Sequence, residues 1–194
     1  MSEREPFETL DPENWAEMRE LAHRMVDDAL DYIESARERP VWTPVTAAVA
    51  DRLRAPAPAE PTDPRAVYEE FLDDILPYNL HTNHPRFWAW YMGSGNVMGA
   101  LGDFLAAVLN PNVGGISHVA PLVEQQVIGW INDMMGFPDN ASGLLTSGAS
   151  MANLIALAVA RNSNCGYDVR REGVRAGPGP LTVYASTEIH SCHQ

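Results

Sequence analysis

Apolar side chains near the start of the chain recur every three or four residues, at Trp15, Met18, Ala22, Met25, Ala29 and Tyr32. This spacing places them on one face of an amphipathic helix, with acids and arginines on the other. Asp11 is a candidate N-cap and Pro12 suits the first helical position, so a helix is predicted from there to about Arg39. Such a stripe must be covered by its own domain or by a partner subunit, and the pattern does not choose between them.

A second, shorter helix follows a proline-rich linker. The stretch RAPAPAEPTDP is expected to be semi-extended because of its prolines. Asp63 and Pro64 then start the helix. Its inward side chains are predicted to be Val67, Phe71 and Ile75. Residues 1–78 are therefore predicted to form a helical appendage.

The composition changes near His81, where HPRFWAWYMGSGNVMG is first aromatic and then glycine-rich. Helices are predicted over 97–109 and 119–135, the latter ended by Gly136. The apolar run GLLTSG leads into a third helix in ASMANLIALAVARN, and LTVYAS is a predicted strand of β-branched and apolar character. This alternation predicts an α/β domain with a largely parallel sheet over residues 79–194.

The sequence given stops at Gln194, shortly after the predicted strand. A strand in that position would lack neighbours and leave sheet edges exposed. We therefore expect these residues to be part of a longer or split protein, and we expect the piece expressed alone to be poorly soluble.

Composition narrows the class of protein. The 194 residues are 45% hydrophobic and 20% charged, which suits a packed core. The net charge of −13 repels nucleic acid and anionic membranes, so neither is an expected partner. All 13 basic residues are arginines, so this chain cannot itself supply a lysine nucleophile.

The cellular setting is predicted to be cytoplasmic and reducing. Cys165 and Cys192 are too few for a disulfide framework. The first residues, MSEREPFETL, contain no apolar signal region, and the longest apolar runs are too short to cross a bilayer.

The motif TSGASMAN has the composition of an anion-binding turn. Ser147, Gly148, Ala149 and Ser150 are small and lie at the predicted start of a helix, where free N–H groups and the helix dipole favour a phosphate. The Ser150 hydroxyl adds a further donor. An ordinary glycine–serine turn that only caps a helix has the same pattern. This motif alone therefore does not distinguish an anion-binding turn from a capping turn.

A second interpretation makes Ser150 a nucleophile. Residues 148–152 differ by one residue from the G-x-S-x-G elbow, because the last glycine is missing. His190 or His193 could supply the base of a serine hydrolase, although no motif marks an acid between Ser150 and these histidines.

The segment YASTEIHSCHQ places His190 just beyond the predicted strand, where its flat ring could stack on a ligand at the sheet edge. A histidine at a surface strand end is the simpler alternative. Metal binding is a further alternative for His190, Cys192 and His193, and for the pair His81 and His84. Their spacing matches no standard zinc pattern, and no metal site is predicted.

Four segments in this order, HPRFWAWYMGS, EQQVIGWINDMMGFP, GLLTSGASMANLIALAVAR and VYASTEIHSCHQ, resemble the group II pyridoxal-phosphate decarboxylases. This family includes the aromatic-L-amino-acid and glutamate decarboxylases. The likeness extends to the N-terminal helices and RPVWTPV, and so covers nearly the whole chain.

The resemblance implies the fold-type I architecture of pyridoxal-phosphate-dependent transferases. Residues 1–78 would be a helical segment that wraps around a partner subunit. Residues 79–194 would be the first, incomplete part of a large mixed-sheet α/β domain that binds pyridoxal 5'-phosphate. The resemblance also implies a homodimer with active sites at the interface.

The family's functional residues map onto this sequence by motif. Cofactor binding falls to Gly148, Ala149, Ser150 and His190, and substrate binding to Trp90 and Tyr91. His190 would be catalytic, because its ring stacks on the cofactor's ring. Residues 112–117 match a loop that approaches the other subunit's active site. Met92-Gly93 replaces the Pro-Thr of members with aromatic substrates, which weakens the expectation of an aromatic substrate.

The function implied is decarboxylation of an L-amino acid, with aromatic amino acids as one candidate class, to the amine and carbon dioxide. The required lysine and the carboxylate facing the pyridine nitrogen are expected beyond Gln194, so the piece alone is expected to be inactive. Two alternatives stay open: a non-catalytic piece that binds cofactor or dimerises with a lysine-bearing partner, and the serine hydrolase.

Overall fold

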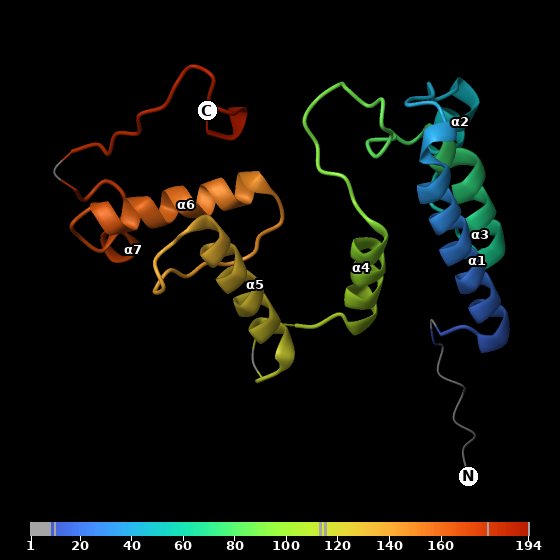
Figure 1. Ribbon diagram of the computed structural model, residues 1–194, viewed down its shortest axis with the longest axis horizontal. Helices are drawn as coiled ribbons and strands as arrows, with labels where there is room; N and C mark the ends of the chain where they lie inside the picture. The colour runs from blue at the N-terminus through green and yellow to red at the C-terminus, as the bar shows by residue number, and fades with distance from the viewer. Residues whose placement is uncertain (1–8, 10, 113, 115, 178, 194) are drawn as a thin grey trace, which may run out of the picture. The chain divides into compact units, whose positions relative to one another are not determined.

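The computed structural model describes residues 9, 11–112, 114, 116–177 and 179–193 (Figure 1). The chain divides into two compact units, Met1–Asn110 and Pro111–Gln194. The boundary expected at residue 78 lies inside the first unit and stays a prediction. None of the described helices combines the length and the apolar character needed to span a bilayer.

The first helix, α1 (Trp15–Glu34), begins later than predicted because Asn14, not Asp11, is its N-cap. The Asn14 side chain accepts hydrogen bonds from the N–H groups of Ala16 (3.0 Å) and Glu17 (3.4 Å). It also donates to the Glu17 carboxylate at 2.6 Å, which couples the cap to the first turn. The helix ends at Glu34 and tightens into a 3-10 turn, η1 (Ser35–Glu38), before the predicted Arg39.

The buried face of α1 is centred on Leu21, which the predicted stripe left out. Leu21 is 4% exposed, whereas Trp15 and Met25 of that stripe are 58% and 44% exposed. At about 100° per residue, Leu21, Asp28 and Tyr32 share one side of the helix, and all three are buried or half-buried. The predicted buried face was wrong because it was drawn from apolar residues, whereas polar residues such as Asp28 also pack on the buried face.

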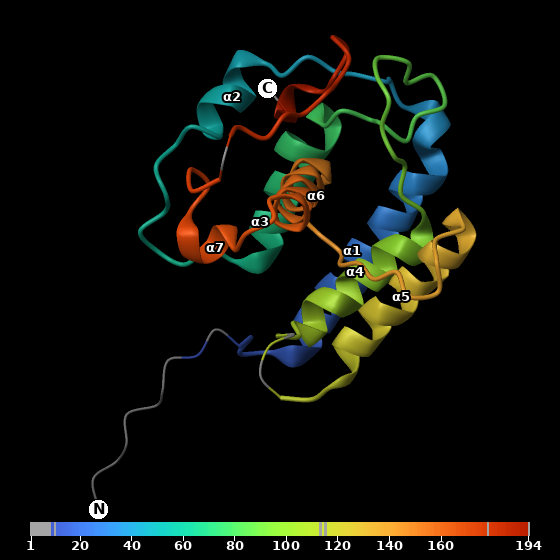
Figure 2. The same cartoon turned by 90° about the vertical axis from the view of Figure 1, so that its left-hand side faces the viewer.

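The helices α2 (Ala47–Arg52) and α3 (Pro64–Glu70) complete the first helical cluster. Asp63 caps α3 and Pro64 occupies its first turn, as predicted. The chain continues through a π-helical turn, η2 (Phe71–Ile75), and a 3-10 turn, η3 (Leu76–Tyr78). Figures 1 and 2 show α3 running alongside α1.

The inward face predicted for this segment is wrong, because its buried side chains are Tyr68 and Asp74. Tyr68 donates a hydrogen bond to Asp28 of α1 at 2.9 Å. Asp74 accepts two from Arg52 of α2, one of them at 2.6 Å from Nε. The π-helical turn adds a residue to the turn, which rotates the later positions away from the regular helical spacing. Of the three residues predicted to face inward, Ile75 lies at the end of this turn, whereas Val67 and Phe71 precede or begin it, and all three are exposed.

The segment after η3 buries two histidines against this cluster. His81 is 2% exposed and His84 is 7% exposed. The Tyr32 hydroxyl lies 2.6 Å from His81 Nδ1, and the Arg39 guanidinium stacks 3.7 Å above the Tyr32 ring. His84 Nδ1 accepts a hydrogen bond from the Arg86 N–H at 2.9 Å. Both histidines therefore serve the packing of the first unit.

The remaining long helices match the prediction. The first unit ends with α4 (Val97–Leu109), which Asn96 caps. The second contains α5 (Val119–Met135), terminated by the left-handed Gly136 (φ 70°), and α6 (Ala149–Asn164). A short helix, α7 (Val169–Glu172), and a 3-10 turn, η4 (Ser191–His193), were not predicted.

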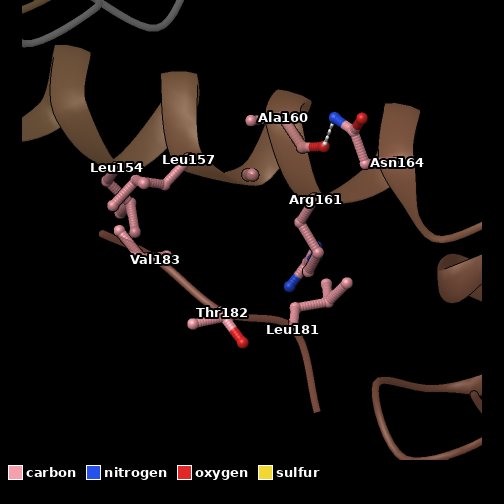
Figure 3. Close-up of a pocket in the computed structure, with 9 residues that line it drawn as sticks. Leu154, Leu157, Ala160, Arg161, Asn164, Leu181, Thr182 and Val183 are labelled. Carbon is pink, nitrogen blue, oxygen red and sulfur yellow. Dashed lines mark hydrogen bonds between the residues drawn. The ribbon is translucent and has the colours of Figure 1, made fainter. Parts of the chain in front are cut away.

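No β-strand occurs in the described ranges, so the predicted strand at residues 181–186 and the mixed sheet are not confirmed. A strand requires hydrogen bonds to a neighbouring strand, and none of the described segments supplies one. Residues 181–183 instead run beside α6, where Val183 approaches Leu154 and Leu157 (Figure 3). The sheet stays a prediction.

Candidate functional site

The start of α6 differs from that of every other α-helix in the described ranges, because no side chain caps it. The other six are capped by Asn14, Thr46, Asp63, Asn96, His118 and Asp168. At α6 the N-cap position is Gly148, with φ 89° and ψ 156°. Only glycine adopts this region without strain.

The open end of α6 leaves backbone donors available. The first helical hydrogen bond runs from the Ala152 N–H to the Gly148 carbonyl at 3.2 Å. The N–H groups of Ala149, Ser150 and Met151 therefore have no acceptor within the helix. Together with the helix dipole, these donors suit a phosphate group, because they contribute positive charge where other helices have a capping oxygen.

The segment that carries His190 is held against α6. Asn153 of α6 donates a hydrogen bond to Cys192 Sγ at 3.4 Å, and η4 contacts α6. The exposed His190 ring accepts a hydrogen bond from the Cys192 N–H at 3.2 Å through Nδ1. The second unit thus contains the turn at Gly148, the open start of α6 and the His190 imidazole.

Trp90 and Tyr91 lie on the first unit and are exposed. Trp90 packs edge-on against Phe87, with ring centroids 5.6 Å apart. The Tyr91 side chain is fully exposed. Their contact with a substrate stays a prediction. In the loop predicted over residues 112–117, Val113 and Gly115 lie outside the described residues.

The serine hydrolase interpretation finds no support in the described part of the chain. Among the described side chains no hydrogen bond joins Ser150 to His190, which accepts instead from the Cys192 N–H. Within the described ranges, no three histidine, cysteine or acidic side chains gather into a group that could hold a metal ion.

A hollow of about 570 Å³ lies between α6 and residues 181–183, away from Gly148 (Figure 3). Its lining is largely apolar, with Leu154, Leu157 and Val183 at one side and Leu181 near Arg161 at the other (Figure 3). It lacks the cluster of free backbone donors found at the start of α6, and Arg161 is the one charged side chain among the described residues that line it.

Comparison with known families decides between these interpretations. Residues 48–194 match the pyridoxal-dependent decarboxylase conserved domain. The chain belongs to this family. The resemblance to group II pyridoxal-phosphate decarboxylases is therefore confirmed, and so is the prediction of pyridoxal phosphate as the cofactor. The start of α6 fits the phosphate of that cofactor, because its free N–H groups can donate hydrogen bonds to an anion.

Several curated relatives of this decarboxylase-family chain are named as decarboxylases of aromatic amino acids. It is 33% identical to an aromatic-L-amino-acid decarboxylase of Bacillus atrophaeus over 90% of this chain and 35% of the relative. It is 31% identical to tyrosine decarboxylase 2 of Narcissus pseudonarcissus, over 95% of this chain and 38% of the relative. The chain thus spans little more than a third of these curated relatives.

A solved structure of the same family shares the fold. The chain superposes with a TM-score of 0.67 on Oryza sativa TDC, solved with PLP and tryptamine, at 26% sequence identity. The superposition covers 85% of this chain and 37% of that protein. The chain therefore resembles about a third of the fold of that structure.

Proposed function

We propose that these residues provide the phosphate-binding and ring-stacking part of an enzyme that decarboxylates an aromatic L-amino acid to its amine. The observation that carries the proposal is the uncapped start of α6, because it leaves free N–H donors at the positions where the family motif expects the cofactor phosphate. Bound pyridoxal phosphate would accept the electron pair that the departing carbon dioxide leaves on the substrate.

Each residue of the site has a distinct task in this proposal. The N–H groups of Ala149 and Ser150, with the Ser150 hydroxyl, would bind the phosphate oxygens. Gly148 would allow the backbone to turn sharply into α6, since its φ of 89° excludes most side chains. The His190 ring would stack on the pyridine ring and keep it in a fixed plane.

The aromatic substrate class is supported by the names of two related proteins, from Bacillus atrophaeus and Narcissus pseudonarcissus, because both names specify aromatic amino acids. Trp90 and Tyr91 offer aromatic surface for such a substrate, because both are exposed on the first unit. Met92-Gly93 departs from the pattern of aromatic-substrate members. We propose that the departure changes the shape of the substrate pocket without changing the substrate class.

The required lysine must come from outside these 194 residues, because all 13 basic residues are arginines. We propose that the complete protein supplies it from a segment absent from this sequence, and that the 194 residues alone are inactive. A second candidate function follows from the same observation: a non-catalytic subunit that pairs with a lysine-bearing partner.

We propose that the complete protein is a homodimer and that α1 lies at its interface. Trp15, Val26 and Leu30 project from the side of α1 away from Leu21, and they are 58%, 37% and 37% exposed. A second subunit would remove this apolar surface from water. The cytoplasmic location stays a prediction, which fractionation of cells would test.

The proposed function is tested by assaying the complete protein with pyridoxal phosphate and separate L-amino acids. Release of carbon dioxide and the matching amine from L-tryptophan, L-tyrosine or L-phenylalanine is the expected result. L-Glutamate is the control substrate. Turnover of glutamate alone would contradict the aromatic class, and failure to bind pyridoxal phosphate would contradict the function as a whole.

A further inference from the structure

Three side chains on one face of α5 contact the segment that leads into the phosphate-binding turn. Asn132 Nδ2 donates to the Ala141 carbonyl at 3.2 Å. The Ile128 Cγ2 methyl lies 3.3 Å from the position that a Cβ atom on Gly143 would occupy. Glu124 Oε1 accepts a hydrogen bond from the Leu145 N–H at 2.8 Å. Every fourth residue of the helix thus meets every second residue of the segment.

The distance between successive contacts along the helix matches the distance between successive contacts along the extended segment, which explains why the contacts are regular. Four helical residues rise about 6 Å, and two residues of extended chain advance about 6.6 Å. Residues 141, 143 and 145 can therefore face the stripe formed by Asn132, Ile128 and Glu124, in opposite chain directions. The last contact, at Leu145, lies three residues before Gly148.

Side-chain packing contributes little to the position of this segment in the described structure. Leu144 and Leu145 are 56% and 55% exposed. The contacts to α5 are therefore the main restraint on the backbone just before the turn. Among them, the bond from Leu145 to the Glu124 carboxylate is charge-assisted, and such bonds are stronger than neutral ones.

We propose that Glu124 is a positioning residue for the phosphate-binding turn. It fixes the backbone at Leu145 and thereby holds the N–H groups of Ala149 and Ser150 in place before the phosphate arrives. Glu124 acts through Leu145 and needs no contact with the cofactor. The inference rests on the proposed function, since it assigns a task within the same site.

Two conservative variants separate the effect of the side chain's length from the effect of its negative charge. Glu124→Gln keeps an oxygen at the same reach without the negative charge, whereas Glu124→Asp keeps the charge but withdraws the oxygen from Leu145. Glu124→Leu removes both. The control is Asn132→Ala, which breaks the contact at Ala141, farther from the turn on the same helix face.

The measurements use the complete protein. The first is the dissociation constant of pyridoxal phosphate, measured by titration. The second is amide hydrogen exchange at residues 145–150 in cofactor-free protein, and the third is the thermal midpoint. We expect Glu124→Gln to bind less tightly than the wild type but more tightly than the other two variants, because a neutral hydrogen bond replaces the charge-assisted one. Glu124→Asp and Glu124→Leu should bind roughly tenfold or more weakly and exchange faster at residues 145–150. Asn132→Ala should keep the wild-type affinity even where its thermal midpoint falls.

The outcomes distinguish this inference from the proposed function. Wild-type binding retained in Glu124→Asp and Glu124→Leu would overturn the role of Glu124 alone. An equal loss of affinity in Asn132→Ala would also overturn it, because any loosening of the segment would then suffice. A wild-type protein that fails to bind pyridoxal phosphate would overturn the proposed function, and the role of Glu124 with it.

Discussion

Asn153, in the second turn of α6, donates a hydrogen bond to Cys192 Sγ at 3.4 Å. This contact joins two segments that are 39 residues apart in the sequence. It brings the turn that carries His190 to the N-terminal part of the helix that begins at Ala149. We propose that the phosphate held by the helix start and the ring stacked on His190 belong to one bound cofactor.

Replacing His190 tests the stacking role. His190→Ala should weaken binding of pyridoxal phosphate by roughly two- to tenfold, because a stacked aromatic pair contributes about 0.5–1.5 kcal/mol beyond its buried area. His190→Phe keeps a flat ring and should bind nearly as tightly as the wild type. Titration of the complete protein measures both, with the exposed His23→Ala as the control. Equal affinity in all these variants would contradict stacking.

Replacing Gly148 tests the backbone geometry of the turn. Gly148→Ala places a side chain at φ 89°, and we expect a loss of about 1–3 kcal/mol in the free energy of unfolding. Affinity for the cofactor should fall as well. Gly129→Ala, in the interior of α5 with nothing within 4 Å of an added Cβ, should be neutral or stabilise by up to about 1 kcal/mol. Urea unfolding measures the difference. A Gly148→Ala protein as stable as the wild type would show that the turn has another conformation.

Stability should fall as the pH drops below about 6.5 because of His81. Burial, with smaller contributions from Arg39 and His84, lowers the pKa of His81 below its ordinary value of 6.5. The unfolded chain therefore takes up a proton near pH 6.5 that the folded chain does not. Folding is favoured above this pH, and the advantage is lost as the pH falls toward the lowered pKa.

The variant His81→Gln should lose much of this pH dependence, although it also loses the contact with Tyr32 and is less stable at neutral pH. Thermal unfolding at several pH values measures the slope. An unchanged slope in His81→Gln would assign the effect to other groups.

The outer face of α1 provides a test of the dimer. Val26→Glu places a charge on that face, and we expect it to shift the complete protein from dimer to monomer. Ala59→Glu adds the same charge at an exposed position in the segment between α2 and α3, outside the proposed face of α1, and should leave the dimer intact. Analytical ultracentrifugation measures the mass of each variant. A stable dimer in Val26→Glu would place the interface elsewhere.

The described helices differ in how well the sequence predicted them. The helices α4, α5 and α6 match because each joins an apolar run to a local start or stop signal, such as Gly136. The cap of α1 was wrong because Asp11 and Asn14 are both suitable residues, and only the folded chain selects one. The inward face after Asp63 was wrong because Tyr68 is directed inward by Asp28, a residue 40 positions away.

The candidate site was predictable to a similar degree. Gly148, Ala149 and Ser150 could be predicted because small residues before an apolar helix are visible in the sequence. Glu124 could not, because its partner is the backbone N–H of Leu145, and a backbone group has no sequence signature. Its spacing of eight residues from Asn132 on one helix face was the only available signal.

The central claim is that the free N–H groups at the start of α6 hold the cofactor phosphate. Hydrogen exchange at Ala149, Ser150 and Met151 of the complete protein tests it most directly, measured with pyridoxal phosphate and with pyridoxal, which lacks the phosphate. We predict that pyridoxal phosphate slows exchange at these three amides and that pyridoxal does not. Tight binding of pyridoxal phosphate without any slowing at these amides would contradict the account.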